Sequence, residues 1–320
     1  MFTDFALLAI GLLVLYYGAE TMVRGATSVA AIMGISPMMI GLTVVAFGTS
    51  APELVASLFA VYKGSGDIAL GNIIGSNIAN VGLALGASAL ISPIVIHHIE
   101  EKSETPVMLG FTALFLIMAI DGTISRLDGL ALFVCLIGFL GYRIIKVKSQ
   151  RAKAVVMENR VDDIIDREHG LNFEMGLTAA GIIGVMAGAY LLIDSASSIA
   201  RGFGVSELII GVTVVAIGTS LPELATTVVA AFRGHSDLAF GNVAGSNIFN
   251  IGLILGLTAM AVPLETDWGA IYVEMSVMAI LSIALAPIVW RRRIGRTAGA
   301  FMLLFYALFM LWIVVVKMAG

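Results

Sequence analysis

The sequence predicts an all-α polytopic membrane protein, with about ten transmembrane helices in two inverted-topology repeats of five helices each. Three observations support this fold class: the composition, the length of the apolar runs and an internal repeat. Of the 320 residues, 59% are hydrophobic and only 12% are charged. A soluble domain carries about 25% charged residues, so this chain lacks the charge to cover a wet surface. The composition therefore excludes a soluble fold and also intrinsic disorder.

The apolar runs set the number of helices, because a membrane helix needs about 20 mostly apolar residues. Runs such as Leu177–Ile193 and Ile271–Val289 show no alternation of apolar and polar residues, which argues against an outer-membrane β-barrel. The expected helices cover residues 4–33, 37–63, 67–92, 104–121, 126–147, 174–203, 207–233, 237–262, 268–290 and 297–317.

The two halves of the chain repeat each other. A shift of 170 positions places Thr43–Leu54 (TVVAFGTSAPEL) on Thr213–Leu224 (TVVAIGTSLPEL), and Gly71–Gly86 on Gly241–Gly256. We expect a first five-helix repeat at 1–147, a cytoplasmic linker loop at 148–173 and a second repeat at 174–320. Since each repeat has an odd number of helices, the second enters the membrane from the opposite face.

The distribution of Lys and Arg predicts the orientation. In the expected ten-helix arrangement, the polar segment 148–173 and the cluster Arg291–Arg293 lie on the same side of the membrane as the other main groups of basic residues. Cytoplasmic loops carry the excess of Lys and Arg, so we expect both termini outside. The expected location is the cell inner (plasma) membrane, as a multi-pass protein.

We number the ten expected helices 1 to 10 in chain order. Breaks are expected within helices 2 (37–63), 3 (67–92), 7 (207–233) and 8 (237–262). Pro52 has no N–H, so the carbonyl of Gly48 loses its helical partner, while Thr49 and Ser50 can cap a new half-helix. Gly218–Glu223 repeats this pattern in the second half. Irregular backbone at membrane depth survives only inside protein or beside a wet cavity. The freed carbonyls, around Ala46 and Ala216, are therefore candidate cation ligands.

Glu53 and Glu223 are the most informative residues of these segments. An ionised side chain at mid-bilayer costs roughly 2.5–3.5 kcal/mol on insertion scales, so such residues usually have a task. At equivalent points of an inverted repeat the two carboxylates would converge near the midplane. There they repel each other unless a cation or a shared proton lies between them. The alternative is that each is protonated and simply hydrogen-bonded within the bundle.

The partner helices add neutral oxygens. Ser76 and Asn80 lie four residues apart on one helix face, and Ser246 and Asn250 repeat the pattern. Carboxylate, hydroxyl, amide and carbonyl oxygens are hard ligands that suit Ca²⁺, Na⁺ or similar ions and not thiophilic metals. For any one of these polar residues, helix–helix packing is the alternative.

The paired GTSxPE and GN..GSN...N segments resemble the two alpha-repeats of the sodium/calcium exchanger family, within the calcium/cation antiporter superfamily. The resemblance covers nearly the whole chain. It implies an antiporter, not an enzyme, that expels Ca²⁺ by electrogenic exchange for inward-moving Na⁺. No cofactor and no nucleic-acid or obligatory protein partner is implied beyond the lipid bilayer, and a monomer suffices. By position it implies a set of metal ligands: Glu53, Glu223, Thr49, Ser50, Thr219, Ser220, Ser76, Ser246, Asn80, Asn250, and the carbonyls of Ala46 and Ala216.

Two departures from the family pattern refine this reading. Asn80 and Asn250 are both amides where many relatives carry one Asp, so the site holds at most two negative charges, which balance one Ca²⁺. Asn250 also argues weakly against a potassium requirement. The short central segment resembles the minimal prokaryotic form, which lacks calcium-sensing domains. The main alternative is a proton/calcium antiporter, and an ion channel is a more distant one.

Overall fold

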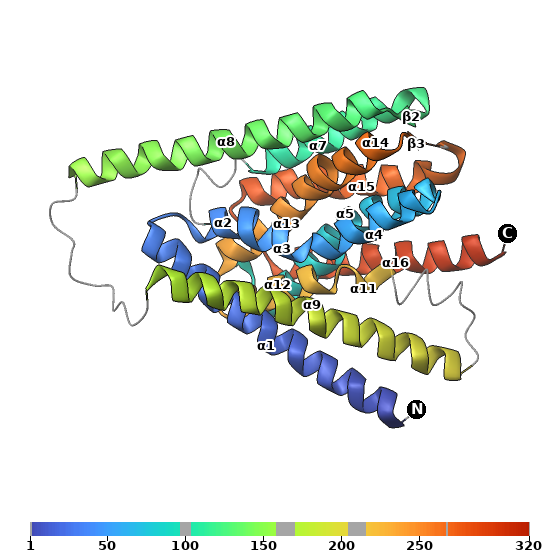
Figure 1. Cartoon of the computed structure of the whole chain (residues 1–320), viewed down its shortest axis with the longest axis horizontal. Helices are drawn as coiled ribbons and strands as arrows, with labels where there is room; N and C mark the ends of the chain where they lie inside the picture. The colour runs from blue at the N-terminus through green and yellow to red at the C-terminus, as the bar shows by residue number, and fades with distance from the viewer. Residues whose placement is uncertain (1, 97–103, 158–169, 204–215, 267, 320) are drawn as a thin grey trace.

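The computed structural model describes residues 2–96, 104–157, 170–203, 216–266 and 268–319. Nearly all of them are helical (Figure 1). Eight described helices are long and apolar enough to cross a membrane, or nine spans if the bent pair Pro37–Thr49 and Ala51–Tyr62 counts as one. The shorter apolar helix Leu221–Phe232 follows residues 204–215, where the expected start of helix 7 lies outside the described residues. The prediction of an all-α polytopic membrane protein is confirmed.

The elements of the first repeat are α1 (Phe2–Met33), α2 (Pro37–Ile40), the π-helical η1 (Gly41–Val45), α3 (Ala46–Thr49), α4 (Ala51–Tyr62), α5 (Gly66–Ala79), the π-helical η2 (Asn80–Leu85), α6 (Gly86–Ile91), β1 (Ile94–Val95), α7 (Glu104–Met118), the 3₁₀ turn η4 (Ala119–Asp121), β2 (Thr123–Ile124) and α8 (Arg126–Met157). Those of the second repeat are α9 (Leu171–Gly202), α11 (Ala216–Gly218), α12 (Leu221–Phe232), α13 (Ser236–Phe249), the π-helical η6 (Asn250–Leu255), α14 (Gly256–Ala261), β3 (Leu264–Glu265), α15 (Trp268–Trp290), β4 (Arg293–Ile294) and α16 (Arg296–Ala319).

Helix α8 continues well past residue 147, where the apolar run ends and the linker was expected to start. Its last part, KSQRAKAVVM, is rich in Lys, Arg, Gln, Ala and Met, which favour helix without needing an apolar face. The helix therefore extends beyond its membrane-spanning part, Arg126–Lys146. Of the expected linker, residues 158–169 lie outside the described residues.

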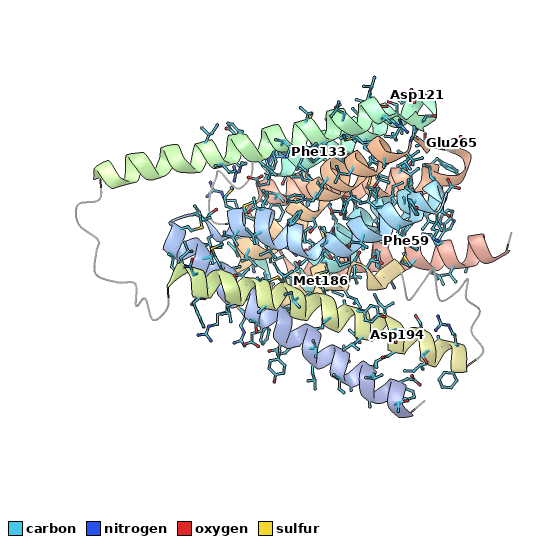
Figure 2. The ribbon with its side chains drawn as sticks, in the orientation of Figure 1. Phe59, Asp121, Phe133, Met186, Asp194 and Glu265 are labelled. Carbon is cyan, nitrogen blue, oxygen red and sulfur yellow. The ribbon has the colours of Figure 1, made fainter. Side chains whose placement is uncertain are left out.

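Two short antiparallel ladders relate the repeats. In one, Ile94 of β1 pairs with Ile294 of β4, and in the other Ile124 of β2 pairs with Leu264 of β3. β3 lies 170 positions after β1, and β4 lies 170 positions after β2, so the ladders are copies of each other. Asp121 and Glu265 mark the end of the molecule where the β2–β3 ladder lies (Figure 2). Each ladder joins one repeat to the other, as an inverted repeat requires.

The repeats are also intertwined through their helices. Gly86 of α6 faces Gly299 of α16 so closely that a Cβ built at Gly86 would lie 3.2 Å from the Gly299 carbonyl oxygen. The equivalent pair joins α8 to α14, where a Cβ at Gly129 would lie 2.6 Å from the Gly256 carbonyl oxygen. Glycine is needed at these crossings because the backbones touch. The fifth helix of each repeat thus packs on the third helix of the other.

Helices α1 and α9 form a separate pair along one side of the molecule (Figure 1). Small residues let their backbones approach, as at Gly18, where a Cβ would lie 2.6 Å from the Val185 amide nitrogen. At Gly25, a Cβ would lie 2.7 Å from the Thr178 amide nitrogen. The backbones of the two helices therefore lie close together at these glycines.

The predicted interruptions take two forms. Helix 2 bends by 42° between α3 and α4, at Ser50, and helix 7 is interrupted between α11 and α12. In helices 3 and 8 the interruption is a wider, π-helical turn inside a continuous span, at η2 and η6. Such π-helical turns often occur at functional sites. Both begin at an asparagine that the sequence singles out, Asn80 and Asn250.

One ion pair joins the α1–α9 pair to the helix core: Arg233, which follows α12, binds Glu20 of α1. The two side chains are 46% and 32% exposed, so water weakens their attraction. We expect Glu20→Gln to lower the free energy of unfolding by less than about 1 kcal/mol, the usual value of an exposed pair. Denaturation in detergent would measure this, with the swapped pair Glu20→Arg and Arg233→Glu as control. The prediction is wrong if Glu20→Gln lowers the free energy of unfolding by several kcal/mol and the swapped pair has the free energy of the wild type.

Candidate cation site

The two predicted carboxylates lie at the starts of two half-helices. Glu53 is in the first turn of α4 and Glu223 in the first turn of α12, each with Pro one position earlier. Both side chains are 1% exposed. The helix N-terminus carries a partial positive charge that favours an anion, so each half-helix supports its own carboxylate. Ser50 and Ser220 occupy the residues before these helices, with nearly identical backbone angles (φ −83° and −90°).

Side chains of the two repeats meet at these carboxylates. The Ser50 hydroxyl donates to Glu223 Oε1 at 3.0 Å, and Thr49 and Ser246 face the same carboxylate. On the other side the Ser220 hydroxyl donates to the Ser76 hydroxyl oxygen at 3.4 Å. The Glu53 and Glu223 carboxylates lie near enough to repel each other. The structure thus brings both acids, and hydroxyls of both repeats, into one cluster.

Several oxygens of this cluster have no hydrogen-bond partner among the described residues. They are buried atoms that can accept a proton or a cation: Glu53 Oε1, Glu53 Oε2, Glu223 Oε2, Asn80 Oδ1, Asn250 Oδ1 and Ser246 Oγ. A buried polar atom left without a partner costs about 1–3 kcal/mol, and a charged one costs more. Three of these six atoms belong to the two carboxylates and three to neutral side chains, and a cation would satisfy them together.

The remaining predicted ligands lie beside this cluster, in two different settings. The expectation that the break frees the Ala46 carbonyl is wrong, because this carbonyl accepts from the Ser50 amide at 3.0 Å and the Thr49 hydroxyl at 3.3 Å. The break at Pro52 lies too late in the chain to remove the Ser50 amide. Ala216 begins α11 in the second repeat, and its side chain lies outside the described residues. Thr219 is half-buried, whereas its repeat mate Thr49 is fully buried.

Sequence reasoning missed an outer layer of amides, Asn72, Asn242 and Asn247. The Asn80 amide nitrogen donates to Asn247 Oδ1 at 3.0 Å, which leaves the Asn80 oxygen for the cluster. All three residues sit in the GN and SN pairs that recur with the repeat, at 71–72 and 241–242 and at 76–77 and 246–247. That recurrence was the available signal, but it marks all polar positions of the repeat equally.

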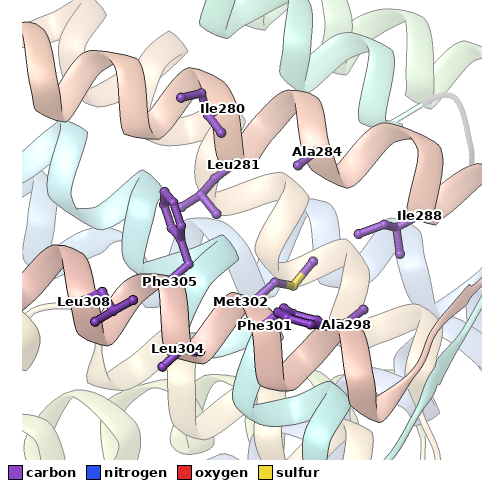
Figure 3. Close-up of a pocket in the computed structure, with 10 residues that line it drawn as sticks. All are labelled: Ile280, Leu281, Ala284, Ile288, Ala298, Phe301, Met302, Leu304, Phe305 and Leu308. Atoms are coloured by element: carbon purple, nitrogen blue, oxygen red, sulfur yellow. The ribbon is translucent and has the colours of Figure 1, made fainter.

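Two hollows elsewhere in the structure are apolar and do not serve as cation sites. One, about 460 Å³, lies between α15 and α16 and is lined by side chains such as Leu281, Met302 and Phe305 (Figure 3). The other, about 590 Å³, lies where α1, α2, α8 and α9 meet and has Thr43 and Thr178 as its polar lining residues. Neither hollow includes Glu53 or Glu223. Within the described residues, no group of three or more His, Cys, Asp and Glu is placed to hold a metal, so the buried cluster relies on two acids and neutral oxygens.

Two intertwined inverted repeats with a buried, oxygen-lined acidic cluster at their junction define a secondary cation transporter. The family model described as "Sodium/calcium exchanger protein" matches residues 3–145 and 173–315. The chain belongs to the sodium/calcium exchanger family, and it is a membrane antiporter of Ca²⁺ and another cation, not an enzyme.

Individual relatives cover nearly the whole chain. The inner membrane protein YrbG of Escherichia coli is 37% identical over 92% of this chain and 91% of its own. The sodium/calcium exchanger MaX1 of Methanosarcina acetivorans is 32% identical over 96% and 97%. A solved structure of the sodium-calcium exchanger NCX_Mj, soaked with Na⁺ and Ca²⁺, matches with a TM-score of 0.82 at 35% identity, over 96% of this chain and 97% of that one. The expected fold and family are confirmed.

Proposed function

We propose that the protein exchanges Na⁺ for Ca²⁺ at one central site and thereby extrudes Ca²⁺ from the cell. The observation that supports this most is the set of buried oxygens without partners around Glu53 and Glu223. The proposed ligands are the carboxylates of Glu53 and Glu223, the hydroxyls of Thr49, Ser50, Thr219, Ser220, Ser76 and Ser246, the amide oxygens of Asn80 and Asn250, and the carbonyls of Ala46 and Ala216. Ca²⁺ takes 6–8 oxygen ligands, a number this set supplies.

Competition for one site explains exchange. Ca²⁺ bridges the two carboxylates, and Na⁺ ions that use overlapping ligands replace it. Either load neutralises the acids, so the occupied site can become enclosed and cross to the other face. In the empty site no cation separates the two carboxylates, so they repel each other when both are ionised. The empty site resists enclosure, and the antiporter therefore does not return empty.

The α1–α9 pair is the proposed moving part. Its two helices pack on each other through close glycine contacts. The pair lies along one side of the molecule, and the intertwined helices described above form the rest (Figure 1). Sliding of this pair across the core would open the site to one face and then the other. With both termini outside, the basic clusters Arg143–Lys153 and Arg291–Arg296 would face the cytoplasm of a cell inner membrane.

The proposed ratio is about three Na⁺ per Ca²⁺, as the family resemblance suggests. One net positive charge then moves in each cycle, and the membrane potential contributes roughly 2.3 kcal/mol per 100 mV. Exchange at this ratio is electrogenic, and its rate depends on voltage.

Flux into liposomes tests both coupling ion and charge. Na⁺-loaded proteoliposomes diluted into Na⁺-free buffer with ⁴⁵Ca²⁺ should take up Ca²⁺, and an inside-positive K⁺/valinomycin potential should speed this uptake. Control vesicles would hold choline in place of Na⁺. Uptake driven by internal acid without Na⁺ would contradict the proposal and favour proton/calcium antiport. Uptake that depends on Na⁺ but is insensitive to voltage would contradict the ratio.

A further inference from the structure

The threonines at the two helix breaks each contact an asparagine of the opposite repeat. The Thr49 hydroxyl donates to Asn242 Oδ1 at 3.4 Å, across 193 residues of sequence. The Thr219 hydroxyl donates to Asn72 Oδ1 at 3.5 Å. Asn72 and Asn242 are equivalent in the repeat, as are Thr49 and Thr219. The same cross-repeat contact is therefore built twice, which a chance packing contact would not be.

Each asparagine is itself held by its own repeat. The Asn242 amide nitrogen donates to the Thr227 hydroxyl oxygen at 3.0 Å, on α12. The Asn72 amide nitrogen donates to the Ser57 hydroxyl oxygen at 2.9 Å and to the Glu53 carbonyl at 3.2 Å, on α4. For Asn72 the Glu53 carbonyl can only accept, so the amide nitrogen lies on this side and the oxygen faces the threonine. For Asn242 the Thr227 hydroxyl accepts from the amide nitrogen, which leaves the oxygen on the side of Thr49.

The hydroxyl hydrogen of Thr49 has three acceptors near it: Asn242 Oδ1, the Ala46 carbonyl at 3.3 Å and the Glu223 carboxylate. A hydrogen bond from the Thr49 hydroxyl to the Ala46 carbonyl would compete with a cation for that carbonyl oxygen. A hydrogen directed at Asn242 leaves the Thr49 lone pairs available, together with the one lone pair of the Ala46 carbonyl that the Ser50 amide does not use. A hydroxyl has one hydrogen and two lone pairs, so its outer hydrogen bond decides what it offers to an ion.

We propose that Asn72 and Asn242 are positioning residues for ion binding, each of which takes the hydroxyl hydrogen of the opposite repeat's threonine and turns that oxygen toward the carboxylates. The inference rests on the proposed role of Thr49 and Thr219 as ligands. Partners that orient metal ligands in this way are worth about 10- to 100-fold in affinity. Each asparagine acts through the threonine that it contacts, Asn242 through Thr49 and Asn72 through Thr219.

A crossed double-mutant cycle tests the assignment. Cation affinity would be measured in detergent, by isothermal titration with CaCl₂ and separately with NaCl. We expect Asn242→Leu to weaken binding about tenfold or more. In a Thr49→Val background the same substitution should change affinity less than about twofold, because the hydroxyl it orients is gone. Asn72→Leu should keep its full effect beside Thr49→Val and lose it beside Thr219→Val.

The pattern of the cycle separates positioning from structural support. A loss on Asn242→Leu that is equal in wild-type and Thr49→Val backgrounds, or no loss at all, would overturn the proposal. Thr112→Val, which removes a buried hydroxyl that donates only within its own helix, is the control and should leave affinity unchanged. If Asn242→Leu yields no folded protein, the half-buried Asn72 with Thr219 carries the same test. Because the titration needs no flux, Ca²⁺ binding without Na⁺-driven uptake would reject the proposed exchange while still deciding this point.

Discussion

Glu53→Gln is expected to lower Na⁺-dependent Ca²⁺ uptake at least about 100-fold at subsaturating Ca²⁺. Both carboxylate oxygens of Glu53 are buried without a partner among the described residues, and the proposed exchange has Ca²⁺ bind them. A pair of unit charges about 4 Å apart gains about 4 kcal/mol at an effective dielectric constant near 20. Each 1.4 kcal/mol is about tenfold in affinity, and glutamine keeps the size of the side chain while removing the charge.

Proteoliposome uptake of ⁴⁵Ca²⁺ over a range of Ca²⁺ concentrations would measure the effect of Glu53→Gln. Glu265→Gln, on the exposed side of β3, is the matched control, because it removes the same charge far from the cluster. It should leave uptake within about twofold of the wild type. Uptake by the Glu53 variant within tenfold of the wild type would show that Ca²⁺ does not depend on this carboxylate.

Gly245→Val is the second substitution with a large expected effect, on both stability and ion affinity. A Cβ at Gly245 would lie 2.5 Å from the Leu42 carbonyl oxygen and 2.7 Å from the Ala46 Cβ. Overpacking of this kind costs about 1–3 kcal/mol. The valine side chain would displace η1 and α3, and α3 carries the Ala46 carbonyl and Thr49. We therefore expect a lower melting temperature in detergent together with weaker Ca²⁺ and Na⁺ binding.

An exposed glycine on another helix is the control for Gly245→Val. Gly138 on α8 is exposed, and among the described residues nothing lies within 4 Å of a Cβ built there. Gly138→Val should keep the melting temperature of the wild type within about 1–2 °C. A Gly245 variant as stable as the wild type, with unchanged ion affinity, would show that α13 and helix 2 can separate without cost.

The sequence was sufficient to predict the two acids and the breaks, for reasons that lie in single residues. Glu53, Pro52 and their repeat mates are costly within a membrane helix, so their presence there points to a function. Asn72 and Asn242 carry no such cost, since an amide packs well between polar helices. The proposed role of these asparagines depends on contacts with the opposite repeat: Asn72 contacts Thr219, 147 residues away, and Asn242 contacts Thr49, 193 residues away. Only the folded structure shows which of these polar groups meet. The π-helical form of the interruptions in helices 3 and 8 and the extension of α8 were not predicted, because they follow from packing and helix propensity and not from apolar periodicity.

The two ladders and glycine crossings have a consequence for how the chain is assembled. β1 pairs with β4, about 200 residues later in the sequence, and α6 packs on α16, the last of the described helices. Contacts so distant in sequence form late, since loop closure must precede them. The first five helices therefore cannot mature as a unit during synthesis, and a nascent chain that stops before residue 290 lacks the groups that close its first half. The repeat is a unit of sequence, whereas the contacts that close each repeat come from the other one.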